Sequence, residues 1–273
     1  MKRIAIHSVP RSGSTWLGSI FDSCPNVLYK YQPLFSYALK GFLSPESSAE
    51  EIKTFFLKLE QINDNFIDQK EAKAKGIVPE FRKESFTTIV YKEVRYNNIL
   101  KNLLLKDKEI KIIGLIRNPL AVLSSWYNAR REFRKDLGWK LEEEWRFAAK
   151  KNRNKPEEFF GFEKWKQTAQ LFEQLNIEYP ERFYLVKYED LLNKTEETVK
   201  YLFNFSNLNY TKQTEKFIKA SKNKHNEDVY SVFKVKTEDK NWQNLLPRQI
   251  IEEINKNLKT SSMKKYITNF ITI

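Results

Sequence analysis

Residues 10–16 are the first place in the sequence where residue types and spacing could do chemistry. They read Pro-Arg-Ser-Gly-Ser-Thr-Trp and lie between a predicted strand and a predicted helix. Backbone N–H groups at the start of a helix, together with the positive end of its dipole, form an anion site. The hydroxyl groups and the guanidinium of Arg11 add donors that suit phosphate or sulfate oxygens. The alternative interpretation is an ordinary helix cap.

This loop is not a Walker A motif. That motif ends in Gly-Lys-Ser/Thr after a four-residue gap, and no lysine follows Gly13 here. Hydrolysis of a nucleoside triphosphate is therefore disfavoured, while binding of an anion is not.

A second candidate anion site is Arg117-Asn118-Pro119 followed by Ser125. Arg117 ends a predicted core strand, at the edge where open α/β sheets bind ligands. Ser125 lies about two turns into the next helix, close enough to share an anion with Arg117. Two such elements on two strand ends predict a ligand with two separated anionic groups. The alternative is that Arg117 only pairs with an acidic neighbour.

The elements that must position these residues follow from the hydrophobic pattern. Runs rich in β-branched or aromatic residues predict strands over residues 3–8, 27–31, 87–91, 110–116 and 183–186. Helical spacing predicts helices over residues 15–23, 50–66, 157–176 and 189–203, and another that begins at Pro119 with Asn118 as its N-cap. Alternating strands and helices predict a three-layer α/β fold around a mostly parallel sheet, with a P-loop-like strand-loop-helix anion site.

Composition limits the class of protein. The 273 residues include 48 Lys plus Arg and 35 Asp plus Glu, which gives a formal net charge of +13. Such a charge suits an anionic partner such as nucleic acid, a membrane surface or a phosphorylated small molecule. A hydrophobic content of 41% lets the chain bury a large core, so global disorder is excluded. We expect a single domain over residues 1–273.

Several site types are excluded by scarce residues. The one cysteine, Cys24, permits no internal disulfide, and two histidines are too few for a histidine-based zinc site, so no metal is expected. No run of about 18 uncharged apolar residues exists, and the N-terminus does not continue into a signal-peptide core. We therefore expect a cytoplasmic protein without a transmembrane segment, for which peripheral membrane contact stays open.

Residues 130–155 form a densely charged segment with ten basic and five acidic residues, together with Trp139 and Trp145. One interpretation is a solvated helical face. The other is a charged helical insertion, at about residues 130–156, that flanks the active site and meets a polar or anionic acceptor.

Both anion motifs resemble those of one family. Residues 8–21, SVPRSGSTWLGSIF, resemble the 5′-phosphosulfate loop of sulfotransferases that use 3′-phosphoadenosine-5′-phosphosulfate (PAPS). Residues 115–126, LIRNPLAVLSSW, resemble their 3′-phosphate segment, and residues 186–192, VKYEDLL, are similar to a later strand-to-helix segment. Residues 236–246 resemble the cofactor-covering loop without its usual glycines. The residue sequences of the first loop and of residues 27–39 are most similar to those of the carbohydrate sulfotransferase branch.

The resemblance implies an enzyme, a donor and site residues. Arg11, Ser12, Gly13, Ser14, Thr15 and Trp16 would hold the 5′-phosphosulfate of PAPS, Arg117 and Ser125 would hold the 3′-phosphate, and Lys236 would contact the cofactor from the covering loop. Catalysis of an in-line sulfuryl transfer would depend on positioning and charge stabilisation, with Arg11 neutralising the leaving phosphate and no metal required.

The general base is where the sequence departs from the family. Gln32 stands where related carbohydrate and tyrosyl-protein enzymes have a glutamate, and an amide cannot take the proton of the acceptor hydroxyl. Glu93, just past a predicted strand, is the first candidate base, although it is equally consistent with a surface or Arg95-paired glutamate. His7 could serve, with a buried structural role as the alternative, and His225 fits a solvated loop.

We therefore expect a sulfotransferase that moves the sulfuryl group of PAPS to a hydroxyl of a carbohydrate. Alternatives are transfer to a tyrosine or lipid hydroxyl, and a nucleotide- or glycan-binding protein that has lost turnover through Gln32. Nucleic-acid binding is suggested by charge alone, without a recognisable module, and is not expected.

Overall fold

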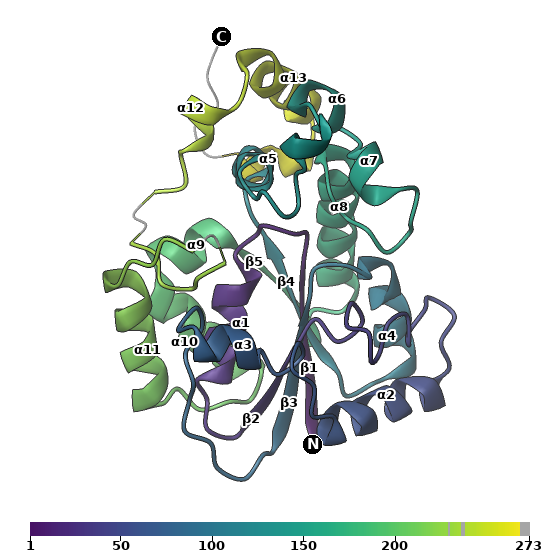
Figure 1. The fold of residues 1–273 in the computed structure, drawn as a ribbon. Helices are drawn as coiled ribbons and strands as arrows, with labels where there is room; N and C mark the ends of the chain where they lie inside the picture. Colours follow the sequence, from purple (N-terminus) through teal and green to yellow (C-terminus); the bar gives the residue numbers. More distant parts are fainter. Residues whose placement is uncertain (229, 236–237, 268–273) are drawn as a thin grey trace.

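The computed structural model describes residues 1–228, 230–235 and 238–267. Within these ranges, five parallel strands form one sheet in the order β2-β3-β1-β4-β5 (Figure 1). The all-parallel sheet confirms the expected α/β class. The strands are β1 (Lys2–Ser8), β2 (Val27–Tyr31), β3 (Thr88–Glu93), β4 (Lys111–Ile116) and β5 (Phe183–Lys187).

Helices connect the strands and cover the sheet. The longer ones are α1 (Ser14–Asp22), α2 (Ala49–Gln61), α4 (Leu100–Lys106), α5 (Pro119–Tyr127), α8 (Phe162–Glu178), α10 (Thr195–Phe205), α11 (Lys212–Asn223) and α13 (Arg248–Leu258). The shorter ones are α3 (Lys70–Ala74), α6 (Leu141–Glu144), α7 (Ala149–Asn152), α9 (Tyr188–Asn193) and α12 (Trp242–Leu245), with 3₁₀ turns η1 (Asn97–Ile99), η2 (Lys135–Leu137) and η3 (Ser262–Tyr266).

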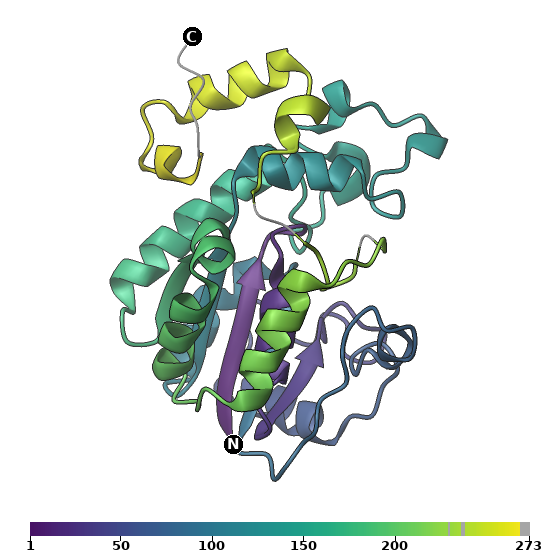
Figure 2. The ribbon, with the colours of Figure 1, turned by 90° about the vertical axis from the view of Figure 1, so that its left-hand side faces the viewer.

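The two faces of the sheet carry separate hydrophobic cores because successive side chains of a strand point to opposite faces. Ile4 and Ile6 of β1 belong to a core shared with α1, α10 and α11, while Ala5 belongs to the core shared with α2, α4 and α8. Figure 2, turned by 90°, shows α11 in front of the sheet. This arrangement is the three-layer architecture expected from the alternation of strands and helices.

The predicted strands are all present, and the predicted helices differ mainly at their ends. The helix expected over residues 50–66 ends at Gln61, because the Asp64 carboxylate accepts the N–H groups of Phe66 and Ile67 and forms a turn instead. The helix expected over 157–176 begins only at Phe162, after Gly161 with a positive φ of 85°. The helix expected over 189–203 is two helices, α9 and α10.

The helix expected at Pro119 forms as predicted. The side chain of Asn118 accepts a hydrogen bond from the N–H of Leu120 at 2.9 Å, and Pro119 occupies the first turn. The cap fixes the direction in which α5 leaves the sheet, and with it the position of Ser125.

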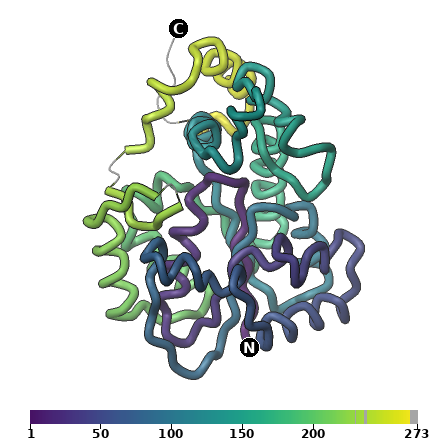
Figure 3. The backbone as a smooth tube through the Cα atoms, in the orientation of Figure 1, coloured from purple at the N-terminus to yellow at the C-terminus, as the bar shows by residue number. Residues whose placement is uncertain are grey.

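The carboxyl ends of the strands all point to one edge of the sheet, at the top of Figure 1, where α5, α6, α12 and α13 lie. Figure 3, in the same orientation, shows the backbone of α12 and α13 at this end of the molecule. Residues 130–156, which contain η2, α6 and α7, lie at the same end of the molecule. Loops far apart in sequence therefore meet at one edge.

His7 takes the buried structural role that was one of its two interpretations. Its side chain is fully buried, with Nδ1 3.0 Å from Asn97 Oδ1 and Nε2 3.2 Å from the Tyr91 hydroxyl. Burial lowers the pKa of His7 to about 4. Among the described residues, no helix is both long and apolar enough to cross a membrane.

Candidate active site

A pocket of about 480 Å³ lies at the carboxyl ends of β1, β3 and β4 and brings the two predicted anion elements together. The loop after β1 contributes Arg11, Gly13, Ser14, Thr15 and Trp16, and the segment after β4 contributes Arg117 and Ser125. Residues on either side of Lys236 complete the wall with Val235, Asp239, Asn241, Trp242 and Leu245. Lys236 itself lies outside the described residues.

The loop after β1 has the backbone geometry of an anion site. Arg11 and Gly13 both have positive φ, 69° and 87°, and helix α1 begins at the next residue, Ser14. Alternating backbone conformations of this kind turn successive N–H groups toward one point. Ser12 is fully buried, does not line the pocket, and has a hydroxyl without a hydrogen-bond partner among the described residues. Its expected contribution to anion binding is therefore that of its backbone.

Tyr188, at the start of α9, packs against this loop. Its ring lies where a side chain on Gly13 would be, since a Cβ at that position would come within 2.5 Å of the ring. The guanidinium carbon of Arg117 lies 4.8 Å from the centre of the same ring, and Trp16 contacts it edge-on. Tyr188 thus fixes the spacing between the two anion elements.

Replacing Gly13 with alanine is expected to lower the free energy of unfolding by about 3 kcal/mol, because strain at positive φ and a clash with the Tyr188 ring add together. Affinity for the bisphosphate product of PAPS, 3′,5′-bisphosphoadenosine (PAP), is expected to fall at least about tenfold, since the loop must move. Chemical denaturation and calorimetric titration measure the two effects. Gly76→Ala is the matched control, because Gly76 also has positive φ but no atom within 4 Å of its added Cβ. Equal effects of both substitutions would contradict the role of Tyr188.

Arg117 is a buried cation held in place from several sides. Its guanidinium donates two hydrogen bonds to the Asp239 carboxylate at 2.7 and 2.6 Å and a third to the carbonyl of Arg11 at 2.6 Å. Burial acts to lower the pKa of Arg117, but the Asp239 carboxylate outweighs it and raises the pKa above its ordinary value. The predicted pairing with an acidic neighbour and the predicted pocket position are therefore both present. A carboxylate from the covering segment occupies the planar fork that suits a phosphate.

Arg11 connects the two anion elements directly. Its Nε donates to the hydroxyl of Ser125 at 3.2 Å, and the Glu132 carboxylate lies 3.9 Å from the same nitrogen. Ser125 thus lies beside the loop after β1 as well as in the pocket of Arg117. The two elements therefore lie side by side in one pocket.

The end of β3 does not place Glu93, the first candidate for the general base, in the lining of the pocket. Lys92 and Val94 line the pocket, whereas Glu93 between them does not. Side chains alternate along a strand, so two residues on the pocket face exclude the one between them. Glu93 is fully buried, and burial raises its pKa. It pairs with the N–H of Val94 at 3.0 Å, and no ion pair to Arg95 joins it within the described ranges.

Lys92 is a buried lysine that lines the pocket. It is 1% exposed, and its Nζ lies 4.2 Å from the centre of the Tyr31 ring. Burial lowers the pKa of Lys92. Where water is excluded, the attraction between a lysine ammonium group and an anion is strong. Lys92 is therefore suited to stabilise negative charge that develops on a bound ligand during a reaction.

Gln32 and His225 both line the pocket. Gln32 has a positive φ of 42°, and its side-chain oxygen accepts a hydrogen bond from Arg95 at 3.2 Å. The Gln32 amide therefore lies in the pocket lining but cannot act as a base. His225 is exposed, as its expected loop position implied, yet it borders the pocket as well.

The pocket residues that were not found from the sequence include Lys92, Glu132 and Tyr188. Lys92 adjoins the chosen Glu93, and only the face of β3 distinguishes the two. Glu132 lies within the charged segment but carries no motif. Tyr188 lies inside VKYEDLL, which was assigned to the fold and to no contact. A group of three or more His, Cys, Asp or Glu side chains able to hold a metal is also absent from the described ranges.

Comparison with known proteins agrees with this geometry. The family model described as "Sulfotransferase domain" matches residues 1–266. Mouse sulfotransferase SULT7A1 complexed with PAP has a similar structure, with a TM-score of 0.56 and 14% identity over 97% of this chain and 86% of that one. A sulfotransferase domain from the curacin biosynthetic pathway gives a TM-score of 0.53 and 17% identity over 94% of this chain and 96% of that one.

A third similar structure is retinol dehydratase in complex with retinol and PAP, with a TM-score of 0.54 and 14% identity over 98% of this chain and 83% of that one. No curated protein sequence gives a significant match. The family match covers nearly the whole chain, including both anion motifs and the covering segment. The chain therefore belongs to the sulfotransferase domain family.

Proposed function

We propose that the enzyme transfers the sulfuryl group of PAPS to a hydroxyl of a carbohydrate and releases PAP. The observation that carries the proposal is the single pocket in which Arg11 and Ser125, from the two predicted anion elements, are joined by a hydrogen bond. One bound nucleotide with a 5′-phosphosulfate and a 3′-phosphate satisfies both elements at once.

The roles that we propose for the donor-binding residues are those implied by the family resemblance, and their places in the pocket support them. The backbone of residues 11–16, the guanidinium of Arg11 and the hydroxyls of Ser14 and Thr15 hold the 5′-phosphosulfate. Arg117 and Ser125 hold the 3′-phosphate, which must displace the Asp239 carboxylate from the guanidinium. Exchange of one bidentate anion for another keeps the buried Arg117 paired throughout.

Glu132 replaces Glu93 as our candidate for the general base. It lines the pocket, its side chain is 23% exposed, and its Oε2 is buried without a hydrogen-bond partner among the described residues. Arg11, 3.9 Å away, places this carboxylate beside the phosphosulfate loop. A carboxylate can take the proton that the Gln32 amide cannot, so the substitution at position 32 does not imply lost turnover.

The transfer step balances with these groups. The acceptor hydroxyl oxygen attacks sulfur, its proton passes to Glu132, and the bond between sulfur and the 5′-phosphate oxygen breaks. Arg11 and Lys92 stabilise charge on the leaving phosphate and on the sulfuryl oxygens. The products are a sulfate ester and PAP, and Glu132 then returns its proton to solvent.

A carbohydrate acceptor is supported by the surroundings of Glu132. Trp139 and several long polar side chains lie beside it, and an aromatic face with hydrogen-bonding neighbours suits a sugar ring. A tyrosine or lipid hydroxyl would need a more apolar acceptor site. The cytoplasmic location expected from the sequence is part of the same proposal.

Mass spectrometry of mixed acceptors incubated with PAPS tests the proposal. The mixture contains oligosaccharides, a tyrosine-containing peptide and a long-chain alcohol, and we expect only oligosaccharides to gain the mass of one sulfuryl group. A gain confined to the peptide or the alcohol contradicts the carbohydrate acceptor. Binding of PAP in calorimetry without a gain on any acceptor would support the alternative of a binding protein without turnover.

A further inference from the structure

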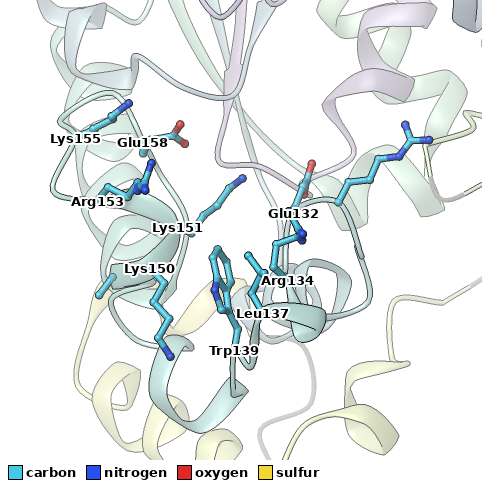
Figure 4. A pocket seen from close by; sticks show the side chains of 11 residues that line it. Glu132, Arg134, Leu137, Trp139, Lys150, Lys151, Arg153, Lys155 and Glu158 are labelled. Carbon is cyan, nitrogen blue, oxygen red and sulfur yellow. The ribbon is translucent and has the colours of Figure 1, made fainter.

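A second cavity opens beside the donor pocket. It measures about 750 Å³ and lies between the chain around η2 and the chain around α7 (Figure 4). We call it the basic pocket and define it by Arg134, Trp139, Lys150, Lys151, Arg153 and Lys155, with Glu132 at its edge. Figure 4 shows Arg134 and Trp139 on one side, and Lys151, Arg153 and Lys155 on the other.

Positive charge in the basic pocket exceeds what its neighbours neutralise. With Arg131 and Glu158, which also line it, the basic pocket has six basic and two acidic side chains. Arg134 pairs with Asp136, and Lys150 pairs with Glu143. Across the described part of the chain, no carboxylate lies within ion-pair distance of Lys151, Arg153 or Lys155, which are therefore available to an anion.

The acidic lining residues do not remove this excess. Glu158 is bound to Arg95 at 3.0 Å, and Glu132 faces Arg11 in the donor pocket. Burial lowers the pKa of Lys151, and the charge of Arg95 lowers it further. The positive charges here are thus close enough to repel one another, and a bound anion reduces that repulsion.

The basic pocket borders the donor pocket. Glu132 lines both cavities, so a ligand in one lies next to the base of the other. A second connection runs from Gln32 in the donor pocket through Arg95 to Glu158 in the basic pocket, with hydrogen bonds of 3.2 and 3.0 Å. An acceptor held in the basic pocket can therefore present a hydroxyl to Glu132.

From this arrangement we infer that the acceptor is an acidic carbohydrate, whose carboxylate or sulfate groups bind Lys151, Arg153 and Lys155 while a neighbouring hydroxyl reaches Glu132. The inference rests on the proposed function and adds the chemical class of its substrate. Trp139 supplies an aromatic side for the sugar ring, and the cations select rings that carry a negative charge. The excess charge of residues 130–155 thereby has a role in specificity.

The test is calorimetric titration of the full chain, saturated with PAP, with three hexasaccharides. Hyaluronan carries carboxylates, heparin carries sulfates and carboxylates, and chitohexaose is neutral. We expect at least one acidic hexasaccharide to bind about tenfold more tightly than the neutral one. Binding of hyaluronan identifies carboxylates as sufficient, whereas binding of heparin alone identifies sulfates.

A matched pair of double variants locates the binding. Arg153→Gln with Lys155→Gln is expected to weaken the acidic hexasaccharide about tenfold, since each exposed ion pair contributes about threefold. Lys140→Gln with Lys259→Gln removes the same charge from exposed positions outside both pockets and is expected to leave affinity within twofold. Equal losses in the two variants would show a general charge effect and overturn the inference.

The failure of this inference is distinguishable from failure of the proposed function. If calorimetric titration of the chain with PAP shows no binding, the proposed function is contradicted. Normal PAP binding with equal affinity for neutral and acidic hexasaccharides contradicts only the acidic acceptor. Tighter binding of a single-stranded oligonucleotide than of either acidic hexasaccharide would also overturn it, since the basic pocket would then serve a nucleic acid.

Discussion

Replacing Glu132 by glutamine is expected to reduce kcat about 10³-fold while affinity for PAP stays within about threefold. The amide keeps the size of the side chain but cannot accept the proton of the attacking hydroxyl, and general base catalysis contributes about 10²- to 10⁴-fold. The 3.9 Å separation from Arg11 makes the ion pair a weak one, so its loss changes donor binding little. Steady-state kinetics and calorimetry with PAP measure the two quantities separately.

Two further glutamates make this result interpretable. Glu142→Gln is the matched control, because Glu142 is exposed, lies ten residues along the same segment and lines neither pocket. Glu93→Gln tests the base expected from the sequence. If kcat falls sharply in Glu93→Gln while Glu132→Gln stays fully active, Glu93 is the general base and the assignment of Glu132 is wrong.

Replacing Arg117 by alanine is expected to weaken PAP binding about 100-fold or more. A bidentate, charge-assisted contact from a buried guanidinium to a phosphate contributes about 3 kcal/mol, which corresponds to about two decades in affinity. The same substitution leaves the Asp239 carboxylate, 8% exposed, without its buried partner. A fall in the free energy of unfolding is therefore expected as well.

The double variant Arg117→Ala with Asp239→Ala separates the two effects. It removes both members of the pair, so stability is expected to recover toward that of the unaltered chain while PAP binding stays weak. Arg3→Ala is the control, since Arg3 pairs with Asp107 at 2.7 Å at the amino end of β1, away from the pocket. Binding of PAP by the double variant with unaltered affinity would exclude Arg117 as the 3′-phosphate ligand.

Local features of the fold were predictable because short-range interactions determine them. The strand that ends at Ser8, the positive-φ turn at Gly13 and the Asn118 cap before Pro119 depend on neighbours within a few residues. Helix ends were less predictable, because the side chain of Asp64 forms a turn that competes with another turn of α2.

The two anion elements could be found from sequence, but their relation to each other could not. Their motifs are local, whereas the bond between Arg11 and Ser125 joins residues 114 positions apart. Strand order and the crossing of α5 over the sheet edge decide that contact. The same applies to Asp239, whose carboxylate reaches Arg117 from a segment 122 residues later.

The sequence by itself determined the α/β class, both anion motifs and the excess of positive charge. Only the tertiary structure decided which acidic residues line the pocket and where that charge gathers. Adjacent residues of a strand lie on opposite faces, and the hydrophobic pattern of so buried a strand does not say which face of β3 meets the pocket. Glu132 and the basic pocket depend on the packing of loops around η2 and α7, which long-range contacts fix and local sequence preferences do not.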